Sequence, residues 1–330
     1  MKSAIEIFAQ LGERLASFGH DAVSQSVIAA ATADNEWFTA DEIICAAESV
    51  RSEMLQRDKL QAWLARYDFS RTTPKRVAII MAGNIPFVGF FDLLCVLAAG
   101  HRAIVKPSAK DRVLMRHIIG LLREIEPKTT VEEVDDDGVS RVRADAVIAT
   151  GSDNSNRYFN SLFRDIPKLL RGNRHSVAVL SGNETDEDMR GLQSDIFLYS
   201  GLGCRNVSMI FTPRGHGLYI GGSASNPKYG NNYLQNRALM TMAGEQFRDT
   251  GSCLLVSDDE FPAAISRVAV VEYDSLDEVR RWLAAHDGEL QCVVTQCLEH
   301  SRAVPFGMAQ RPRLTDYPDD KDVLAFLAGL

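Results

Sequence analysis

Short apolar runs separated by segments of helical spacing make up the chain from Arg76 onward, and this alternation restricts the fold more than any other feature. Strands that are apolar on both faces and alternate with helices are typical of βαβ units, in which helices cover both sides of a parallel sheet. Strands are expected at 77–80, 103–105, 146–148, 177–180, 207–211, 253–256, 268–271 and 292–294, and helices at 231–247 and 276–285. The alternation predicts an α/β protein with two doubly wound, Rossmann-like lobes.

The first 70 residues have a different pattern, because their apolar residues recur at helical spacing. The recurring residues of the first helix are Ile5, Phe8, Leu11, Leu15 and Phe18. Thr39 followed by Glu42 forms a capping box, which predicts the start of a second helix. This part of the chain is therefore expected to be mainly helical.

The boundary between the two lobes is expected near Ser181 and Gly182, where a strand ends in a turn of small residues. This boundary divides the chain into a nucleotide-binding lobe at 1–180, which includes the N-terminal helices, and a catalytic lobe at 181–330. The acidic run at 135–137, followed by glycine, predicts a turn.

Charge and composition exclude several kinds of partner. The net charge of −8 argues against a nucleic acid or an anionic membrane surface, because binding either needs a concentrated basic face. No apolar run reaches the roughly 20 residues that span a bilayer, and the N-terminus lacks the apolar stretch of a signal peptide. The cysteines form no Cys-x-x-Cys pair, and no cluster has metal-ligand spacing. A cytoplasmic protein without a metal, acting on a small molecule, is expected.

Five short segments carry groups that can bind or react. They are Gly83-Asn84-Ile85-Pro86, Lys106-Pro107-Ser108, Thr150-Gly151-Ser152, Leu180-Ser181-Gly182 and Gly201-Leu202-Gly203-Cys204. In content and spacing they resemble the aldehyde dehydrogenase superfamily, and most closely its fatty acyl-CoA reductase branch, which is related to the reductase of bacterial bioluminescence. The resemblance extends from about Arg76 to the C-terminus. It implies an aldehyde dehydrogenase-like fold with the active site between the two lobes.

Cys204 is the most specific position, and the resemblance implies that it is the nucleophile. Its flanking glycines let the backbone N–H of the cysteine point at an oxyanion, and an open loop keeps the thiol accessible. The resemblance makes Asn84 the second oxyanion donor, a role worth roughly 3 kcal/mol of barrier in a dry site. The cysteines at 45, 95, 253 and 292 lie within apolar runs and are expected in the core.

The segment from Lys106 to Ser108 resembles the motif whose lysine contacts the adenosine ribose of NAD(P). Relatives that prefer NAD often carry a glutamate directly after this motif, whereas Ala109 and Lys110 follow it in this chain. Without that carboxylate a 2′-phosphate is not repelled, so NADPH is expected to be preferred, with NADH as the alternative.

Gly151 and Ser152 resemble the turn whose helix start binds the pyrophosphate of the cofactor. The family pattern continues with a later glycine, and Asn156 holds that place. Near the C-terminus, Pro305-Phe306-Gly307 resembles the turn that closes the active site of the superfamily.

Three residues bear on proton transfer. Val179 aligns with the glutamate that activates water in hydrolytic aldehyde dehydrogenases, so the deacylation step has lost its base. Glu184 is a substitute base or, more simply, a solvated surface residue. His175 is a candidate acid or base for the thiol or for the departing thiolate, and its alternative is a packed or capping histidine.

The resemblance implies an acylating acyl-CoA reductase, in which Cys204 accepts the acyl group of a coenzyme A or carrier-protein thioester and NAD(P)H then releases it as an aldehyde. The alternatives within enzymes are an aldehyde dehydrogenase and an acyl-phosphate reductase. The alternative that is not an enzyme is a non-catalytic scaffold of an acyl-transfer complex, which would bind a thioester or a nucleotide. A homo-oligomer and an acyl-protein synthetase are the implied protein partners.

Overall fold

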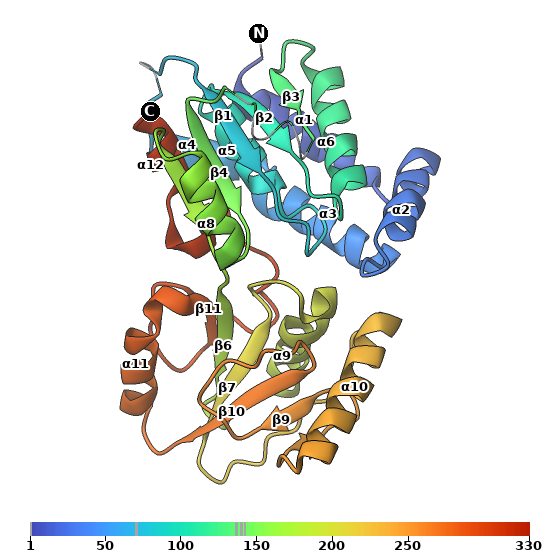
Figure 1. The fold of residues 1–330 in the computed structure, drawn as a ribbon, viewed down its shortest axis with the longest axis vertical. Helices are drawn as coiled ribbons and strands as arrows, with labels where there is room; N and C mark the ends of the chain where they lie inside the picture. The colour runs from blue at the N-terminus through green and yellow to red at the C-terminus, as the bar shows by residue number, and fades with distance from the viewer. Residues whose placement is uncertain (1, 70–71, 136–137, 139–140, 142) are drawn as a thin grey trace. The chain divides into compact units, whose positions relative to one another are not determined.

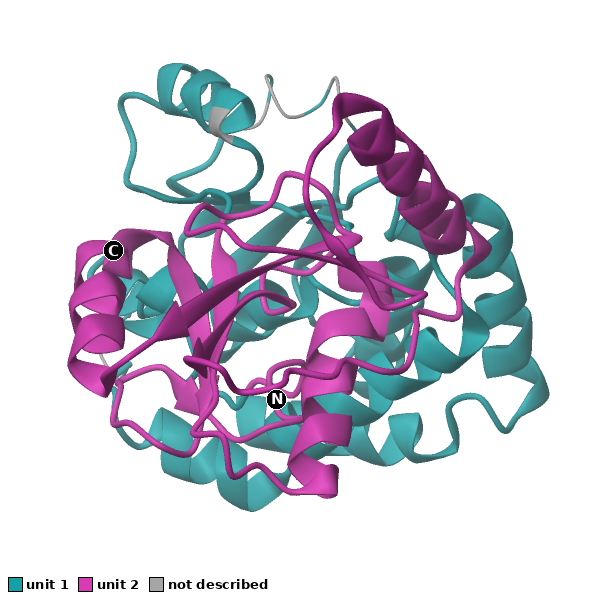
Figure 2. Cartoon of the chain, turned by 90° about the horizontal axis from the view of Figure 1, so that it is seen from below, with its two compact units in different colours: residues 1–173, 313–330 teal, residues 174–312 magenta. Residues whose placement is uncertain are grey.

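The computed structural model describes residues 2–69, 72–135, 138, 141 and 143–330 (Figure 1). The turn expected at 135–137 lies mostly outside these residues. The chain forms two compact units (Figure 2). Each unit has its own, mainly parallel sheet. Unit 1 comprises residues 1–173 and 313–330, and unit 2 comprises residues 174–312.

The N-terminal part of unit 1 is helical, as its spacing predicts. Its helices are α1 (Ala4–Arg14), α2 (Ala22–Asp34), α3 (Ala40–Met54) and α4 (Arg57–Leu64). The capping box of Thr39 and Glu42 is present at the start of α3, and a second one, of Ser3 and Glu6, starts α1. Reciprocal capping satisfies backbone N–H groups that the first turn leaves without partners, which fixes where each helix begins.

The sheet of unit 1 has the strand order β3-β2-β1-β4-β5, with every pair parallel. Its strands are β1 (Arg76–Ile80), β2 (Arg102–Lys106), β3 (Val131–Glu133), β4 (Ala146–Thr150) and β5 (Lys168–Arg171). The connecting helices are α5 (Phe90–Ala98), α6 (Arg112–Ile125) and α8 (Asp153–Leu162). The chain leaves β1 toward β2 and leaves β4 toward β5. The carboxyl ends of β1 and β4 therefore flank the point at which the winding direction changes.

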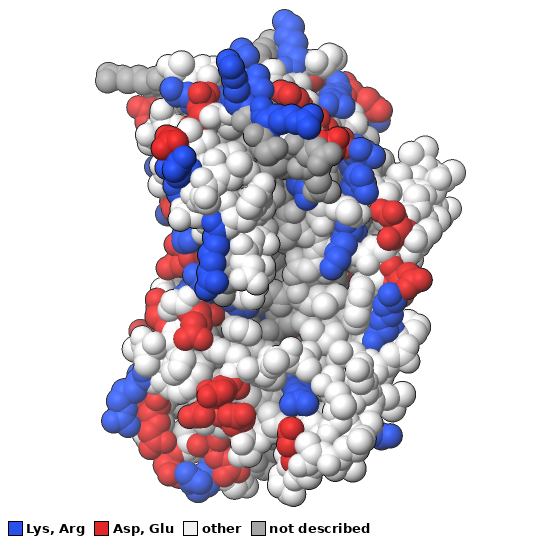
Figure 3. Space-filling model, viewed as in Figure 1, with Lys and Arg blue, Asp and Glu red and all other residues white. Residues whose placement is uncertain are grey.

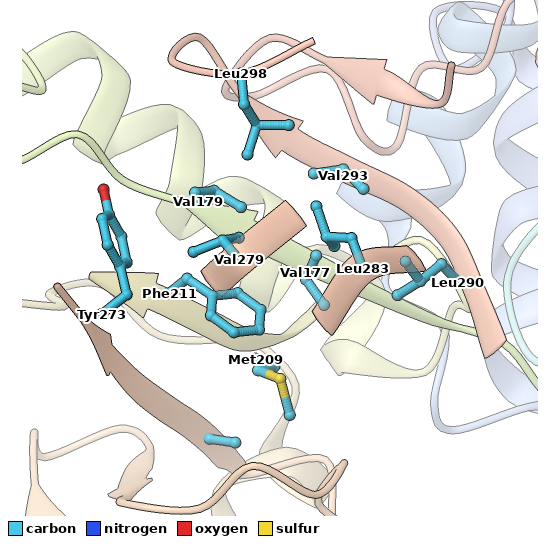
Figure 4. Close-up of a cluster of buried hydrophobic side chains, with 11 residues drawn as sticks. Val177, Val179, Met209, Phe211, Tyr273, Val279, Leu283, Leu290, Val293 and Leu298 are labelled. Carbon is cyan, nitrogen blue, oxygen red and sulfur yellow. The ribbon is translucent and has the colours of Figure 1, made fainter. Parts of the chain in front are cut away.

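The sheet of unit 2 has the order β12-β11-β6-β7-β10-β9-β8, and only the pair of β8 with β9 is antiparallel among the described strands. The strands are β6 (His175–Val179), β7 (Val207–Pro213), β8 (Arg248–Asp249), β9 (Leu254–Val256), β10 (Arg267–Tyr273), β11 (Leu290–Thr295) and β12 (Ala303–Val304). Helices α9 (Asp186–Phe197), α10 (Pro227–Ala243) and α11 (Leu276–Ala285) connect them. Val177, Val179 and Phe211 lie on the face that packs against α11 (Figure 4).

The division of the chain differs from the expected boundary near Ser181 in two ways. Strand β6 precedes that boundary, yet it pairs with β7 and β11 and so belongs to unit 2. The last residues return to unit 1, where α12 (Val323–Ala328) packs on α5. The sequence of a buried strand does not show which sheet the strand joins, because an apolar run indicates burial and not the identity of the neighbouring strands.

Candidate active site

Asn84 lies in the turn between β1 and α5 and is half-buried. Phe87, three residues later, has a left-handed φ of 58°, which is rare for an aromatic residue. The backbone N–H of Phe87 donates a hydrogen bond of 3.2 Å to the Oδ1 atom of Asp111. The turn that carries Asn84 is therefore held by a carboxyl group from the start of α6.

The Lys106–Ser108 segment lies directly against this turn. Lys106 ends β2, beside Ile80 of β1, and its carbonyl oxygen accepts a hydrogen bond from the backbone N–H of Met81. A methyl group on Gly83 would come within 2.5 Å of Cβ of Ser108, so position 83 has room only for glycine. The structure thus brings together the predicted oxyanion residue and the predicted cofactor segment within unit 1.

Asp111 is a residue that the sequence analysis did not single out. Its side chain is 2% exposed, and its Oδ2 atom has no hydrogen-bond partner among the described residues. Burial raises the pKa of Asp111 well above its usual range. An isolated acidic residue after Lys-Pro-Ser resembles any helix N-cap in sequence, so only its contacts reveal its position between two motifs.

Gly151 and Ser152 form the turn between β4 and α8. Ser152 is the N-cap of α8, and its Oγ atom accepts a hydrogen bond from the backbone N–H of Ser155. The N–H of Gly151 donates to the carbonyl oxygen of Arg171, and Asn156 donates a side-chain hydrogen bond of 2.8 Å to the same oxygen. Asn156 therefore fastens α8 to the end of β5, and the N–H of Gly151 is already used within the fold.

Arg171 ends β5, beside this turn, and its side chain reaches α5. Its guanidinium forms two hydrogen bonds, of 2.9 Å and 2.6 Å, with the carboxylate of Asp92, and both side chains are about 5% exposed or less. A bidentate pair of this kind fixes geometry as well as charge. It connects the helix that follows Asn84 with the strand that supports Gly151.

Cys204 is exposed and lies in the turn between α9 and β7. Cys95, Cys253 and Cys292 are buried, as expected, whereas Cys45 is only half-buried. The hydroxyl group of Ser176, in β6, donates to the carbonyl oxygen of Cys204 at 2.9 Å and lies 3.1 Å from the Sγ atom of Cys292. Burial raises the pKa of Cys292 to about 11, so that thiol is a poor competitor for electrophiles.

The Pro305-Phe306-Gly307 turn packs on α9, the helix that leads to Cys204. A methyl group on Gly191 would come within 2.8 Å of backbone atoms of Phe306 and Gly307. The carboxylate of Asp195, near the end of α9, accepts hydrogen bonds from the N–H groups of Gly307 and Ala309 at 2.7 Å and 3.0 Å. Burial raises the pKa of Asp195 to about 7.

Val179 does not lie beside Cys204, so it does not hold the base position that its alignment implied. Val179 is fully buried in the core beneath α11, at the carboxyl end of β6 (Figure 4). Cys204 contacts Ser176, near the amino end of the same strand. Three residues of strand separate these positions by roughly 10 Å, and alternation turns their side chains to opposite faces. A side chain at position 179 therefore cannot serve Cys204 as a base.

Glu184 also lies beyond the carboxyl end of β6. It is half-buried, and its carboxylate accepts hydrogen bonds from the N–H groups of Ser181 and Gly182 and from the hydroxyl of Ser181. Glu184 is thus a turn-forming residue and not simply a solvated one.

His175 is the first residue of β6. It lies at the amino-terminal end of the strand, next to the start of β7, which the Cys204 turn precedes. Its ring stacks on Phe261, with the ring centroids 4.2 Å apart, and burial lowers its pKa. A lowered pKa keeps the imidazole neutral at neutral pH. The stacking matches the packed histidine of the alternative interpretation, and the acid–base role stays a prediction.

Comparison with known proteins identifies the family. The profile of the acyl-CoA reductase (LuxC) family matches residues 22–220, which is more than half of the chain. The chain belongs to the LuxC acyl-CoA reductase family. No curated protein sequence matches the LuxC-family chain at a significant level.

Solved structures show the same fold at low sequence identity. A putative aldehyde dehydrogenase from Burkholderia cenocepacia is 14% identical, with a TM-score of 0.66 over 91% of this chain and 76% of that one. An aldehyde dehydrogenase from Mycobacterium tuberculosis, complexed with NAD+, is 14% identical, with a TM-score of 0.60 over 84% of this chain and 70% of that one. AldH from Staphylococcus aureus is 17% identical, with a TM-score of 0.55 over 86% and 73% of the two chains. The expected aldehyde dehydrogenase-like fold is confirmed, and family and fold together support an aldehyde-related oxidoreductase.

Other expectations concern the surface and the membrane. Acidic and basic side chains both occur across the face in Figure 3, and acidic ones gather over part of unit 2. No described helix is long and apolar enough to cross a bilayer. The described residues contain no group of three or more His, Cys, Asp or Glu side chains arranged to hold a metal ion.

Proposed function

We propose that this LuxC-family protein is an NADPH-dependent acylating reductase that converts an acyl thioester into an aldehyde through a covalent intermediate on Cys204. The observation that carries the proposal is the exposed thiol of Cys204 in a glycine-flanked turn. Exposure distinguishes a reactive cysteine from the buried thiols of the same chain. The family membership points to acyl-CoA as the substrate class.

In the proposed mechanism the thiolate of Cys204 attacks the thioester carbonyl and forms a new C–S bond. The backbone N–H of Cys204 and the side-chain amide of Asn84 stabilise the oxyanion. The bond to the leaving sulfur then breaks, and the sulfur of coenzyme A or of an acyl carrier departs as a thiolate, which takes up a proton from solvent. A hydride, which bound NADPH would supply to the acyl carbon, would expel the Cys204 thiolate and release the aldehyde.

The residues of unit 1 fit a dinucleotide cofactor. Asn84 follows β1 and Ser152 follows β4, and these two strand ends flank the point where the winding of the sheet changes direction. Open α/β sheets bind nucleotides in the crevice at such a point. We assign Lys106 and Ser108 to the adenosine side and Gly151 and Ser152 to the pyrophosphate side. Because the N–H of Gly151 bonds to Arg171, the N–H groups that follow it at the start of α8 would bind the pyrophosphate. When bound, NADPH supplies the hydride, and NADH is the weaker alternative.

The wider assignments follow from the same proposal. Unit 1 is the nucleotide-binding lobe, and unit 2 is the catalytic lobe. The protein acts in the cytoplasm and either forms a homo-oligomer or receives its acyl group from an acyl-protein synthetase. Coupling of aldehyde formation to an upstream thioester-forming enzyme would limit the escape of activated acyl groups.

The test compares the wild type with Cys204→Ala and with Cys45→Ala, whose half-buried thiol lies in α3 of unit 1. NADPH oxidation is followed with acyl-CoA thioesters of several lengths, and the protein mass is measured after incubation with acyl-CoA. We expect the wild type and Cys45→Ala to form aldehyde and acquire an acyl group, and Cys204→Ala to do neither. Turnover only with acyl phosphate or aldehyde would favour the other oxidoreductases. No turnover by well-folded wild type with any of these substrates would favour a binding scaffold.

A further inference from the structure

Asn206, two residues after Cys204, joins the Cys204 turn to the end of α9. Its side chain is 5% exposed. Its Oδ1 atom accepts a hydrogen bond of 2.8 Å from the backbone N–H of Gly203. Its Nδ2 atom donates to the carbonyl oxygens of Asp195, Ile196 and Leu198, at 3.1, 3.1 and 2.8 Å. One side-chain amide therefore forms hydrogen bonds with backbone groups both at the end of α9 and in the turn that carries Cys204.

The backbone between these two points is strained. Tyr199, Ser200 and Gly201 have successive left-handed φ values of 56°, 56° and 70°. For residues other than glycine this conformation is unfavourable and persists only where the surroundings enforce it. The side chain of Ser200 is fully buried, and its hydroxyl has no hydrogen-bond partner within the described chain. The surroundings that hold this conformation include the carbonyl groups fixed by Asn206.

The main chain of Asn206 fixes the direction of the N–H of Cys204. The backbone N–H of Asn206 donates a hydrogen bond of 3.0 Å to the carbonyl oxygen of Gly203. That carbonyl and the N–H of Cys204 belong to one planar trans peptide unit, so they point in opposite directions. With the Gly203 carbonyl directed at Asn206, the N–H of Cys204 must point away from it.

We propose that Asn206 is a positioning residue that holds the Cys204 turn in the geometry needed for nucleophilic attack and oxyanion binding. The catalytic part of this inference rests on the function proposed above. Asparagine suits the position because it offers an acceptor and two donors on one short side chain. Aspartate would keep the acceptor for Gly203 but would place a carboxylate beside three carbonyl oxygens.

The experiment measures the rate of Cys204 alkylation by iodoacetamide as a function of pH, together with kcat and KM for acyl-CoA. The variants are Asn206→Ala and Asn206→Asp. The control is Asn236→Ala, since Asn236 in α10 is 8% exposed and its amide bonds to Asn232 and Ser266. Thermal unfolding shows whether the control is destabilised to a similar degree.

We expect Asn206→Ala to lower kcat by at least about 10-fold, a fraction of the 10²- to 10³-fold loss that follows removal of an oxyanion donor. The pH profile of alkylation should shift, while KM changes little. Asn206→Asp retains the acceptor for Gly203 and, in its protonated form, one donor for the carbonyl oxygens. It should therefore fold at acidic pH and show a smaller loss that grows as the pH rises, so the inference can be tested even if the alanine variant does not fold. Asn236→Ala should leave the alkylation profile unchanged.

A second change tests the role of strain directly. Glycine tolerates a left-handed φ, so Ser200→Gly in the Asn206→Ala background should reverse part of the shift in the alkylation profile and part of the loss in kcat. Equal alkylation profiles and equal kcat values for the Asn206 and Asn236 variants would overturn the inference. Activity that survives Cys204→Ala would instead overturn the proposed function, and the alkylation measurement would still decide the role of Asn206.

Discussion

A substitution at Ala109 tests whether this one side chain affects the preference for NADPH. Ala109 and Lys110 are exposed directly after Ser108, where a carboxylate would repel a 2′-phosphate. We expect wild-type kcat/KM to be higher with NADPH than with NADH, and Ala109→Glu to reduce that ratio by about 10-fold, which corresponds to roughly 1.4 kcal/mol. Ala109→Gln, similar in size but uncharged, is the control and should retain most of the preference. A wild-type preference for NADH would contradict the interpretation of this loop but not the family assignment.

A second prediction concerns the stability of variants at Asp111. Burial raises the pKa of Asp111 and so favours the neutral carboxyl group, for which an amide of the same shape is a close substitute. Asp111→Asn should therefore keep nearly the wild-type stability, whereas Asp111→Ala leaves the N–H of Phe87 without an acceptor and should cost about 1–3 kcal/mol. Urea unfolding of both variants measures the difference. Strong destabilisation by asparagine alone would show that the carboxyl is ionised in the folded protein.

At the scale of elements, Asp195 links α9 to the Pro305-Phe306-Gly307 turn through a carboxylate that titrates with pH. Its folded pKa of about 7 lies above its ordinary value of 3.8, so the folded state binds the proton more tightly than the unfolded state. Protonated Asp195 therefore stabilises the folded state fully when the pH is below 3.8, and this stabilisation is lost as the pH rises to about 7. Melting curves across this range should show a loss in the wild type that is smaller in Asp195→Asn. An identical pH dependence in both proteins would mean that Asp195 is ionised throughout.

For the whole molecule, we predict a long-lived acyl-enzyme when acyl-CoA is supplied without reduced cofactor. Hydride and thiols attack a thioester without a base, whereas water needs one, and a positioned base contributes about 10²- to 10⁴-fold. Val179 and Glu184 both lie at the carboxyl end of β6, away from the Cys204 turn. A mass increase on Cys204 should persist, with little free acid, until NADPH discharges it to aldehyde.

Repeated turnover of acyl-CoA to acid without cofactor would contradict this prediction. His175 would then be the first residue to replace. Burial lowers the pKa of its imidazole, which favours the neutral form, and His175 is the first residue of the strand that contacts the Cys204 turn. His175→Phe retains an aromatic ring against Phe261 and removes only the proton acceptor.

The fold class and the position of most strands could be predicted from the amino-acid sequence. Apolar runs and capping boxes depend on neighbours within a few residues, so they predicted β1, β2, β4 and the start of α3. The spacing of glycines around Cys204 predicted an accessible thiol, and the thiol is exposed. Strand β5 was not predicted, because four residues with a charged residue at each end give little apolar signal.

The fold was needed to show which sheet each strand joins and which side chains face the reactive groups. β6 resembled the strands before it but belongs to unit 2, and Val179 proved to be a core residue far along the strand from Cys204. Asn206 and Asp111 gave no sequence signal, since a polar residue near a motif is common and its partners lie in other elements. Pairing partners and buried hydrogen bonds join residues distant in the chain, and local patterns of hydrophobicity carry no information about them.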